Sequence, residues 1–306
     1  MSENSKRILV ISSADTTDSI EMNDGFVARL NQQLDHHIQI EWHNYHQIGL
    51  EFNTGHLRAF LIENNTDLNS FDFVYFKSYF QDAEQAASIA EYLQEVNVPF
   101  VCSELKDYIP QTKLTQLARL ARAGLPIPKS VFLPHEMWLS HYEQVQRDLG
   151  SPFIFKAIDA RGGNSNFLID TRQAFEKVLS ENQELIFVAQ TFIANSSDLR
   201  VLIIDKQIQL VIRRQRKDNS THLNNTSQGG NAEILPLHEL APESQAMALQ
   251  AAALMKREIA GVDVMFEDGT GDPYILEVNA SPQVATGAFI DEKLKIYGNF
   301  FTNVLK

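Results

Sequence analysis

The stretch GVDVMFEDGTGDPYILEVNASP, residues 261–282, says most about the fold of this 306-residue chain. Two runs rich in β-branched and other apolar residues, 262–266 and 274–279, are typical of strands. Segment 267–273 between them is rich in Gly and Asp, as turns are. The stretch therefore predicts a β-hairpin.

Three oxygen-bearing side chains lie on the two strands of this hairpin. Because side chains alternate between the two faces of a strand, we expect Glu277 and Asn279 to share a face with Ile275. A turn centred near Thr270 places Asp263 opposite Glu277. Two adjacent carboxylates in an apolar sheet repel each other and lose hydration, and a divalent cation offsets both effects. The hairpin thus predicts a metal site, with a solvated strand face that carries incidental acidic residues as the alternative.

A lysine inside an apolar strand marks a second feature. The run FIFKA, residues 153–157, predicts a strand containing Lys156, and the Gly-rich segment 161–166 follows with Gly162 and Gly163. Backbone N–H groups of such a loop can hold phosphates, and a nearby lysine can pair with them. No G-K-[ST] follows the glycines, so this is not a Walker motif. The alternative is a surface hairpin whose edge-strand lysine hinders aggregation.

Basic residues concentrate in one short part of this acidic chain. Arg200 interrupts an apolar strand pattern, and Arg213 and Arg214 end the next one, with Arg216 and Lys217 just beyond. Arginine is suited to bidentate binding of carboxylates and phosphates. Solvated strand ends are the alternative, and they suit Arg216 and Lys217 better than Arg200.

The composition is that of an ordinary globular protein. Hydrophobic residues make up 44% and charged residues 21%, which excludes disordered and collagen-like architectures. The net charge, 26 basic minus 39 acidic residues or −13, disfavours a nucleic-acid partner. No apolar run reaches the roughly 20 residues of a membrane span, and Ser12, Ser13 and Asp15 interrupt the first one, so we expect neither a membrane partner nor a signal peptide.

Cysteine and histidine usage narrows the chemistry. The single cysteine, Cys102, cannot form an intrachain disulfide, which favours a reducing compartment and a cytoplasmic location. The histidine pairs 36–37 and 43/46 have no third ligand at metal spacing. No G-x-S-x-G or other nucleophile motif is present.

Strand and helix patterns alternate along the chain. Strand-like runs at 7–12, 38–42 and 71–76, with a helical pattern at 82–97, predict a small α/β unit with a mainly parallel sheet. No G-x-G-x-x-G follows its first strand, so a dinucleotide fingerprint is absent. Further predicted elements are helices at 113–126, 172–180 and 242–260 and strands at 131–133, 186–190, 199–205 and 207–214. We predict an α/β (α+β) chain divided into residues 1–108, 109–193 and 194–306.

The order of these motifs resembles that of the ATP-grasp fold. Lys113 precedes a helix, Lys156 precedes the Gly-rich loop, and DLR (198–200) and NNTSQGG (224–230) come before the hairpin. The similarity extends from about Lys113 to Gln283 and is greatest to RimK-type glutamate ligases and related carboxylate–amine ligases. It implies an N-terminal α/β pre-grasp domain, an ATP-grasp lid subdomain and a C-terminal metal-binding subdomain.

The resemblance also implies roles for individual residues. Lys113, Lys156 and the loop glycines would contact the phosphates of ATP. Two Mg²⁺ ions, with Mn²⁺ as an alternative, would be held by the hairpin oxygens. Arg200 and Arg214 would face the phosphoryl and acyl groups. The implied site comprises Arg200 and Arg214 as catalytic residues, Lys113, Lys156, Gly162, Gly163, the hinge Gln190, Thr191, Phe192 and Ile193, and Asn225 for the nucleotide, and Asp263, Glu277 and Asn279 for the metal.

The family's chemistry is the formation of an amide bond through an acyl phosphate, with release of ADP and phosphate. The expected partners are ATP and small carboxylate and amine substrates or a peptide, and a homo-oligomer is left open. One alternative is a macrocyclase that modifies a precursor peptide. Others are a catalytically silent ATP-binding module and, ranked last, a hydrolase that uses Asp263 and Glu277 as paired carboxylates.

Overall fold

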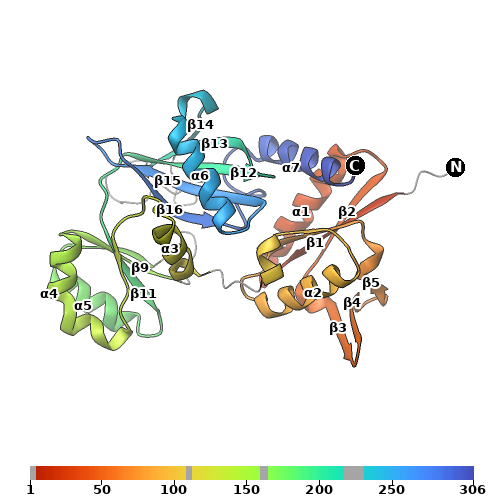
Figure 1. Ribbon diagram of the computed structural model, residues 1–306, viewed down its shortest axis with the longest axis horizontal. Coiled ribbons are helices and arrows are strands. Elements are labelled where there is room, and N and C mark those ends of the chain that lie inside the picture. Colours follow the sequence, from red (N-terminus) through yellow and green to blue (C-terminus); the bar gives the residue numbers. More distant parts are fainter. Residues whose placement is uncertain (1–4, 108–111, 159–164, 217–230) are drawn as a thin grey trace.

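The strands form four sheets within the described residues, and helices pack on these sheets (Figure 1). The computed structural model describes residues 5–107, 112–158, 165–216 and 231–306. The N-terminal residues and the last helix occupy one end of the molecule, and the elements between residues 112 and 279 occupy the other. The predicted α/β class is confirmed. None of the helices in the described ranges is both long and apolar enough to cross a lipid bilayer.

A four-stranded parallel sheet forms the centre of the N-terminal part. Its elements are β1 (Lys6–Ser12), α1 (Thr17–Gln33), β2 (Ile38–His43), β6 (Phe73–Ser78), α2 (Ala83–Glu95) and β7 (Phe100–Val101). The strand order is β2-β1-β6-β7, and β1 pairs in parallel with β2 and β6. Residues of β1 and β6 are buried on both faces, which explains their uninterrupted apolar sequences. The predicted parallel α/β unit is confirmed.

A small antiparallel sheet interrupts this unit between β2 and β6, and the sequence patterns did not predict it. It consists of β3 (Ile48–Asn53), β4 (His56–Leu61) and β5 (Thr66–Asp67). Gly55 has φ of +71° in the turn between β3 and β4, a conformation that favours glycine. Ala59 and Leu61 join the core, whereas Phe52 is 68% exposed. Besides Ala59 and Leu61, Ile48 is buried, so only part of this sheet joins the core.

An antiparallel sheet with an aromatic core follows in the middle of the chain. Its elements are α3 (Lys113–Arg122), β8 (Ser130–Val131), α4 (Trp138–Leu149), β9 (Phe153–Ala157), β10 (Asn166–Ile169), α5 (Arg172–Glu181) and β11 (Phe187–Thr191). The order is β10-β9-β11-β8. The rings of Phe155 and Phe187 stack with centroids 4.3 Å apart, and Trp138 and Phe175 pack around them. This packing fixes β9, and with it the position of Lys156.

A five-stranded antiparallel sheet makes up most of the rest of the chain. Its elements are β12 (Ser197–Ile204), β13 (Gln207–Gln215), β14 (Asn231–Ile234), α6 (Pro242–Leu254), β15 (Ile259–Phe266) and β16 (Pro273–Asn279), in the order β14-β13-β12-β15-β16. Helix α6 was predicted to reach residue 260, which is wrong. Lys256 adopts φ of +52°, and a turn there leads into β15.

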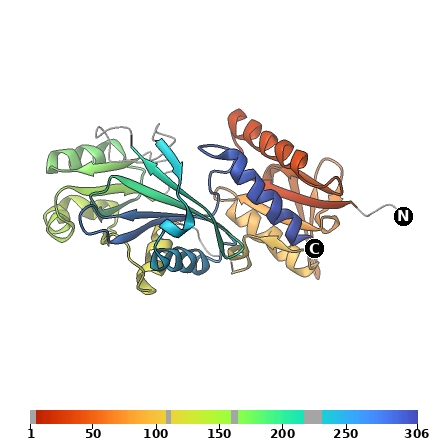
Figure 2. The same cartoon turned by 90° about the horizontal axis from the view of Figure 1, so that it is seen from above.

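The last helix, α7 (Ile290–Val304), returns to the N-terminal part of the chain. It lies beside α1 (Figure 2). The ring of Phe301 contacts that of Phe73, and the ring of Tyr297 contacts that of Tyr75, both on β6. The sequence patterns do not predict this helix. The division of the chain at residues 108 and 193 remains a prediction.

Candidate active site

The hairpin of β15 and β16 brings the predicted metal ligands together. Asp263 is paired with Glu277 across the two strands, so the predicted register is confirmed. A register shift between Asp263 and Val264 changes the alternation on β16. The expectation that Ile275 shares a face with Glu277 is wrong, because Ile275 lies in the apolar core with Val278. The irregularity leaves Glu277 and Asn279 on the opposite, partly exposed face.

The oxygen atoms of these residues suit a divalent cation. The amide nitrogen of Asn279 donates to Oε1 of Glu277 at 2.9 Å and to the carbonyl of Gly261 at 3.4 Å. Within the described residues, the amide oxygen of Asn279 and Oε2 of Glu277 accept no hydrogen bond. Carboxylate and amide oxygens are the ligands that Mg²⁺ prefers. The donor set therefore fits a magnesium ion.

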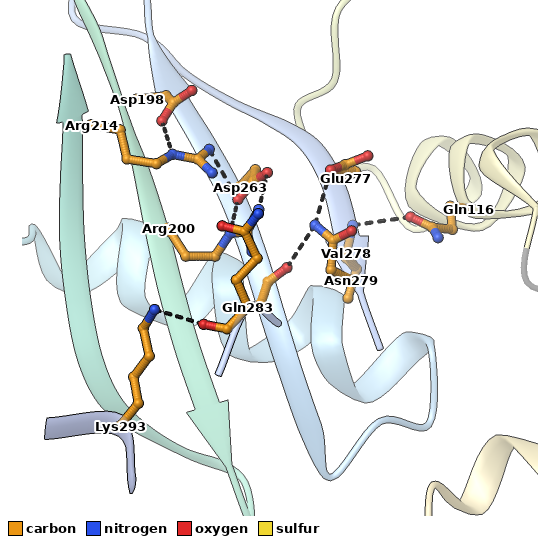
Figure 3. Close-up of polar contacts among 11 residues, drawn as sticks. Gln116, Asp198, Arg200, Arg214, Asp263, Glu277, Val278, Asn279, Gln283 and Lys293 are labelled. Carbon is orange, nitrogen blue, oxygen red and sulfur yellow. Dashed lines mark hydrogen bonds and ion pairs between the residues drawn. The ribbon is translucent and has the colours of Figure 1, made fainter. Parts of the chain in front are cut away.

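Two arginines surround the third predicted ligand, Asp263 (Figure 3). Arg200 of β12 binds both carboxylate oxygens of Asp263, with Nη2 at 2.9 Å from Oδ2. Arg214 of β13 lies 3.2 Å from Oδ1 of Asp263 and donates to Asp198 at 2.6 Å. A carboxylate has about four acceptor positions, and these contacts use three of those on Asp263. Asp263 can therefore keep both arginines and still offer one position to a metal.

The arginines also set the charge of the buried acids. Burial raises the pKa of a carboxyl, but Arg200 and Arg214 outweigh this effect and hold the pKa of Asp263 below its usual range. Burial and the charge of Asp263 raise the pKa of Asp198, although Arg214 opposes them. Gly261 makes this packing feasible, because a Cβ there would lie 3.0 Å from Cδ of Arg200. Arg213, by contrast, pairs with the exposed Glu233 at 2.8 Å.

The two predicted phosphate-binding lysines lie near these acids. Nζ of Lys113, the first residue of α3, donates to the carbonyl of Ala157 at 3.1 Å. Lys156 of β9 forms no ion pair or hydrogen bond with any residue in the described ranges. Burial lowers the pKa of Lys156 to about 8, and Glu277 and Asp263 partly oppose this while Lys113 adds to it. The lysines and the hairpin acids thus lie within electrostatic reach of one another.

The predicted hinge lies at the end of β11. Gln190 is buried and donates to Ser130 at 2.7 Å, and the N–H of Thr191 bonds to the carbonyl of Lys129 at 2.9 Å. Phe192 and Ile193 follow the strand, and their contact with adenine remains a prediction. Gly162, Gly163 and Asn225 fall outside the described residues.

A further set of contacts holds the peptide between Glu277 and Asn279, and the sequence analysis did not find it. The N–H of Val278 donates to Gln116 of α3 at 3.0 Å. Its carbonyl accepts from Arg257, whose Nε pairs with Glu104 at 3.0 Å. Burial raises the pKa of Glu104 to about 7 although Arg257 opposes it. No local pattern in the sequence marks this pair, because Glu104 and Arg257 each stand among other charged and polar residues.

Comparison with known proteins agrees with this geometry. Residues 110–297 match the model of the RimK-like ATP-grasp domain. A probable alpha-L-glutamate ligase of Vibrio vulnificus (strain YJ016) is 29% identical over 175 residues, which are 56% of this chain and 55% of that protein. One from Cellvibrio japonicus (strain Ueda107) is 30% identical over 174 residues, with the same shares. The chain thus spans about half the length of the curated relatives it matches.

Solved structures share the fold over nearly the whole chain. The ATP-grasp ligase PsnB, complexed with a phosphomimetic variant of a minimal precursor, Mg and ADP, has a TM-score of 0.71 and 17% identity, and covers 99% of this chain and 100% of its own. A D-alanine–D-alanine ligase from Bacillus anthracis has a TM-score of 0.68 and 18% identity, with 98% and 96% covered. At these identities the likeness is one of fold.

Proposed function

The chain belongs to the RimK-like ATP-grasp family, and on this basis we propose that it is an ATP-dependent ligase that joins a carboxylate to an amine. The observation that carries the proposal is that oxygen ligands for a metal and positively charged side chains lie together at the hairpin of β15 and β16. Glu277 and Asn279 offer oxygen ligands, Lys156 offers an ammonium without a partner in the described ranges, and Arg200 and Arg214 surround Asp263. The curated relatives, which are named as probable glutamate ligases, support the same reaction class.

Separate sets of residues bind the nucleotide and the metal. Lys113 and Lys156 bind the phosphates of ATP, because the two positive charges lie close together and Lys156 lies near the acids that would hold the metal. Asp263, Glu277 and Asn279 hold Mg²⁺, which when bound neutralises phosphate charge and orients the transferred group. We propose two ions, and Mn²⁺ as a substitute.

The reaction proceeds in two steps on the substrates. A carboxylate oxygen of the acid attacks the γ-phosphorus of ATP, the bond to the bridging oxygen of ADP breaks, and an acyl phosphate forms. The amine then attacks the acyl carbon, phosphate leaves, and the amine loses a proton to solvent. Arg200 and Arg214 stabilise the negative charge that develops on the phosphoryl and acyl oxygens. No covalent bond to the protein is needed.

The reaction products test this proposal directly. ATP, Mg²⁺ and hydroxylamine are incubated with a panel of carboxylates that includes L-glutamate, glutarate and short peptides containing Asp or Glu. We expect ADP and phosphate in equal amounts and a hydroxamate of the acid that is used. AMP and pyrophosphate as products would overturn the mechanism. Bound ATP with no turnover across the panel would favour the silent nucleotide-binding module.

A peptide is the second candidate for the acid substrate. The fold shared with PsnB, which was solved with a precursor peptide, extends over the whole chain, including the N-terminal part that lies outside the match to the family. In a macrocyclase, the carboxylate and the acceptor belong to one peptide. Loss of one water mass from a single peptide, without a second substrate, distinguishes this reaction from ligation of two molecules.

A further inference from the structure

Lys293 is a buried lysine that the mechanism above does not use. It lies in the first turn of α7 and is 6% exposed, whereas lysine is almost never buried without a partner. Its Nζ donates to the carbonyl of Gln283 at 2.6 Å (Figure 3). It also donates to the carbonyl of Thr286 at 3.4 Å. Both partners are neutral. The positive charge of Lys293 is therefore solvated by carbonyl dipoles and not balanced by an acid.

Lys293 lines a pocket together with the two arginines of the candidate active site. Arg200 and Arg214 enter it from β12 and β13, and Lys293 enters from α7. The remaining wall is mostly apolar and is contributed by Leu202, Ile212, Pro282, Gln283, Val284 and Ala288. The pocket thus combines a cationic end with surfaces that suit methylene groups.

The charges around this pocket do not balance. Arg200 pairs with Asp263, and Arg214 pairs with Asp198 and Asp263, so two acids face three cations. Lys293 forms no salt bridge with an acid of the described ranges. Burial, with a smaller contribution from Arg200 and Arg214, lowers the pKa of Lys293 to about 8, and Glu292 opposes this shift. The three cations therefore exceed the two acids by one positive charge, which a bound anion would balance.

The phosphates of ATP are a poor match for that anion. The pKa of Lys156 responds to Glu277, Lys113 and Asp263, whereas that of Lys293 responds to Arg200, Arg214 and Glu292. The two lysines therefore have different charged neighbours, and only Lys293 lines the pocket with Arg200 and Arg214. An apolar wall also suits the methylenes of an acidic side chain better than it suits a triphosphate.

We propose that Lys293 is a specificity-determining residue that binds the carboxylate of an Asp- or Glu-like side chain in the pocket it shares with Arg200 and Arg214. This inference rests on the proposed function, because it assigns that carboxylate to the acid substrate. Lys293 also holds residues 283–286 in place through their carbonyls, so one side chain both shapes the pocket and supplies its free charge.

Binding of small probes to the purified chain tests the assignment. Glutarate, its neutral diamide glutaramide and inorganic phosphate are titrated by calorimetry in the presence of Mg²⁺ and saturating ADP. Lys293→Gln removes the charge but keeps a donor for the two carbonyls, and Lys293→Arg keeps the charge. Lys295→Met on the exposed side of α7 is the matched control.

The expected pattern separates charge recognition from a merely structural role. The original chain and Lys295→Met bind glutarate and discriminate against glutaramide. Lys293→Gln loses about tenfold or more in glutarate affinity, as expected for a lost charged hydrogen bond, and Lys293→Arg recovers most of it. The affinity for ADP stays the same in all variants. A structural role would instead change glutaramide and glutarate binding together.

Three outcomes would overturn the inference. The first is an equal affinity for glutarate in the original chain and in Lys293→Gln. Tighter binding of inorganic phosphate than of glutarate, lost in Lys293→Gln, would assign the pocket to phosphate. ADP binding by a chain that binds no glutarate would also refute the inference while leaving the proposed function intact, whereas failure to bind ADP would count against the proposed function itself.

Discussion

Replacing Lys156 with methionine should stabilise the free protein and weaken its response to nucleotide. The pKa of Lys156 falls from 10.5 to about 8 because burial disfavours the charged form. For a base with a lowered pKa, the cost to folding is present in full below pH 8 and disappears as the pH rises towards 10.5. At pH 7 this fall corresponds to about 3 kcal/mol. Because the side chain keeps some contact with water, we expect roughly half, ~1.5 kcal/mol.

With nucleotide bound, the original chain should be more stable than Lys156→Met. ADP at about 100 times its dissociation constant adds about 2.7 kcal/mol to the free energy of unfolding of the original chain. Loss of a charged hydrogen bond worth about 2 kcal/mol weakens binding roughly 30-fold. The same ADP concentration then adds only about 0.9 kcal/mol to the variant.

Thermal unfolding with and without Mg²⁺ and ADP measures both effects. For a chain of this length that unfolds as one unit, we expect Lys156→Met to melt about 2 °C higher without nucleotide. ADP should raise the melting temperature of the original chain by about 4 °C and that of the variant by about 1 °C. Lys177→Met, an exposed lysine of α5, should behave as the original chain. An equal ADP shift in both proteins, or a free variant that melts lower, would refute the reasoning.

Three further predictions follow from the hairpin and its supports. Glu277→Gln should lower ATP turnover by about 100-fold or more and weaken Mn²⁺ binding measured by electron paramagnetic resonance. The control Glu292→Gln, at an exposed position, should do neither. Intact turnover in Glu277→Gln would contradict the metal assignment. Glu104→Gln should gain stability relative to the original chain as the pH rises. The pKa of Glu104 is raised from 4.5 to about 7 in the folded protein, so the original chain loses up to about 3 kcal/mol of stability between pH 4.5 and pH 7. Denaturant unfolding at pH 5 and 7.5 checks this, and a stability difference that stays constant with pH would refute it. Gln116→Leu leaves the buried N–H of Val278 without an acceptor, so Mn²⁺ affinity should fall by about tenfold with ADP affinity unchanged, and an unchanged Mn²⁺ affinity would show that this contact does not position the ligands.

The sequence could predict the hairpin because its evidence is local. Asp263 and Glu277 stand in apolar runs that flank a turn, and the alternation of a strand is enough to predict that they face each other. The lysine of β9 could be noticed in the same way. The parallel N-terminal unit was predictable because its buried strands are continuous apolar runs.

Other features depend on contacts between distant residues. Glu104 and Arg257 are 153 positions apart, and neither has a neighbour in sequence that predicts the pair. The irregularity in β16 inverts the face of Ile275, which no alternation rule predicts. Lys293 could not be assigned because its helix was not predicted, and because its role depends on a pocket formed with Arg200 and Arg214 on strands far earlier in the chain.

Because α7 packs on the N-terminal sheet, this sheet cannot be fully covered until the last helix has been synthesised. Phe73 and Tyr75 are made early, yet part of the surface that buries them, Tyr297 and Phe301, is made last. A ribosome adds residues at about 5–20 per second, so the partly covered sheet waits roughly 10–40 s for its final helix. During that interval the ATP-grasp part can be completed while the N-terminal unit still exposes aromatic surface. A nascent chain of this protein therefore spends its most aggregation-prone period with its first third unfinished.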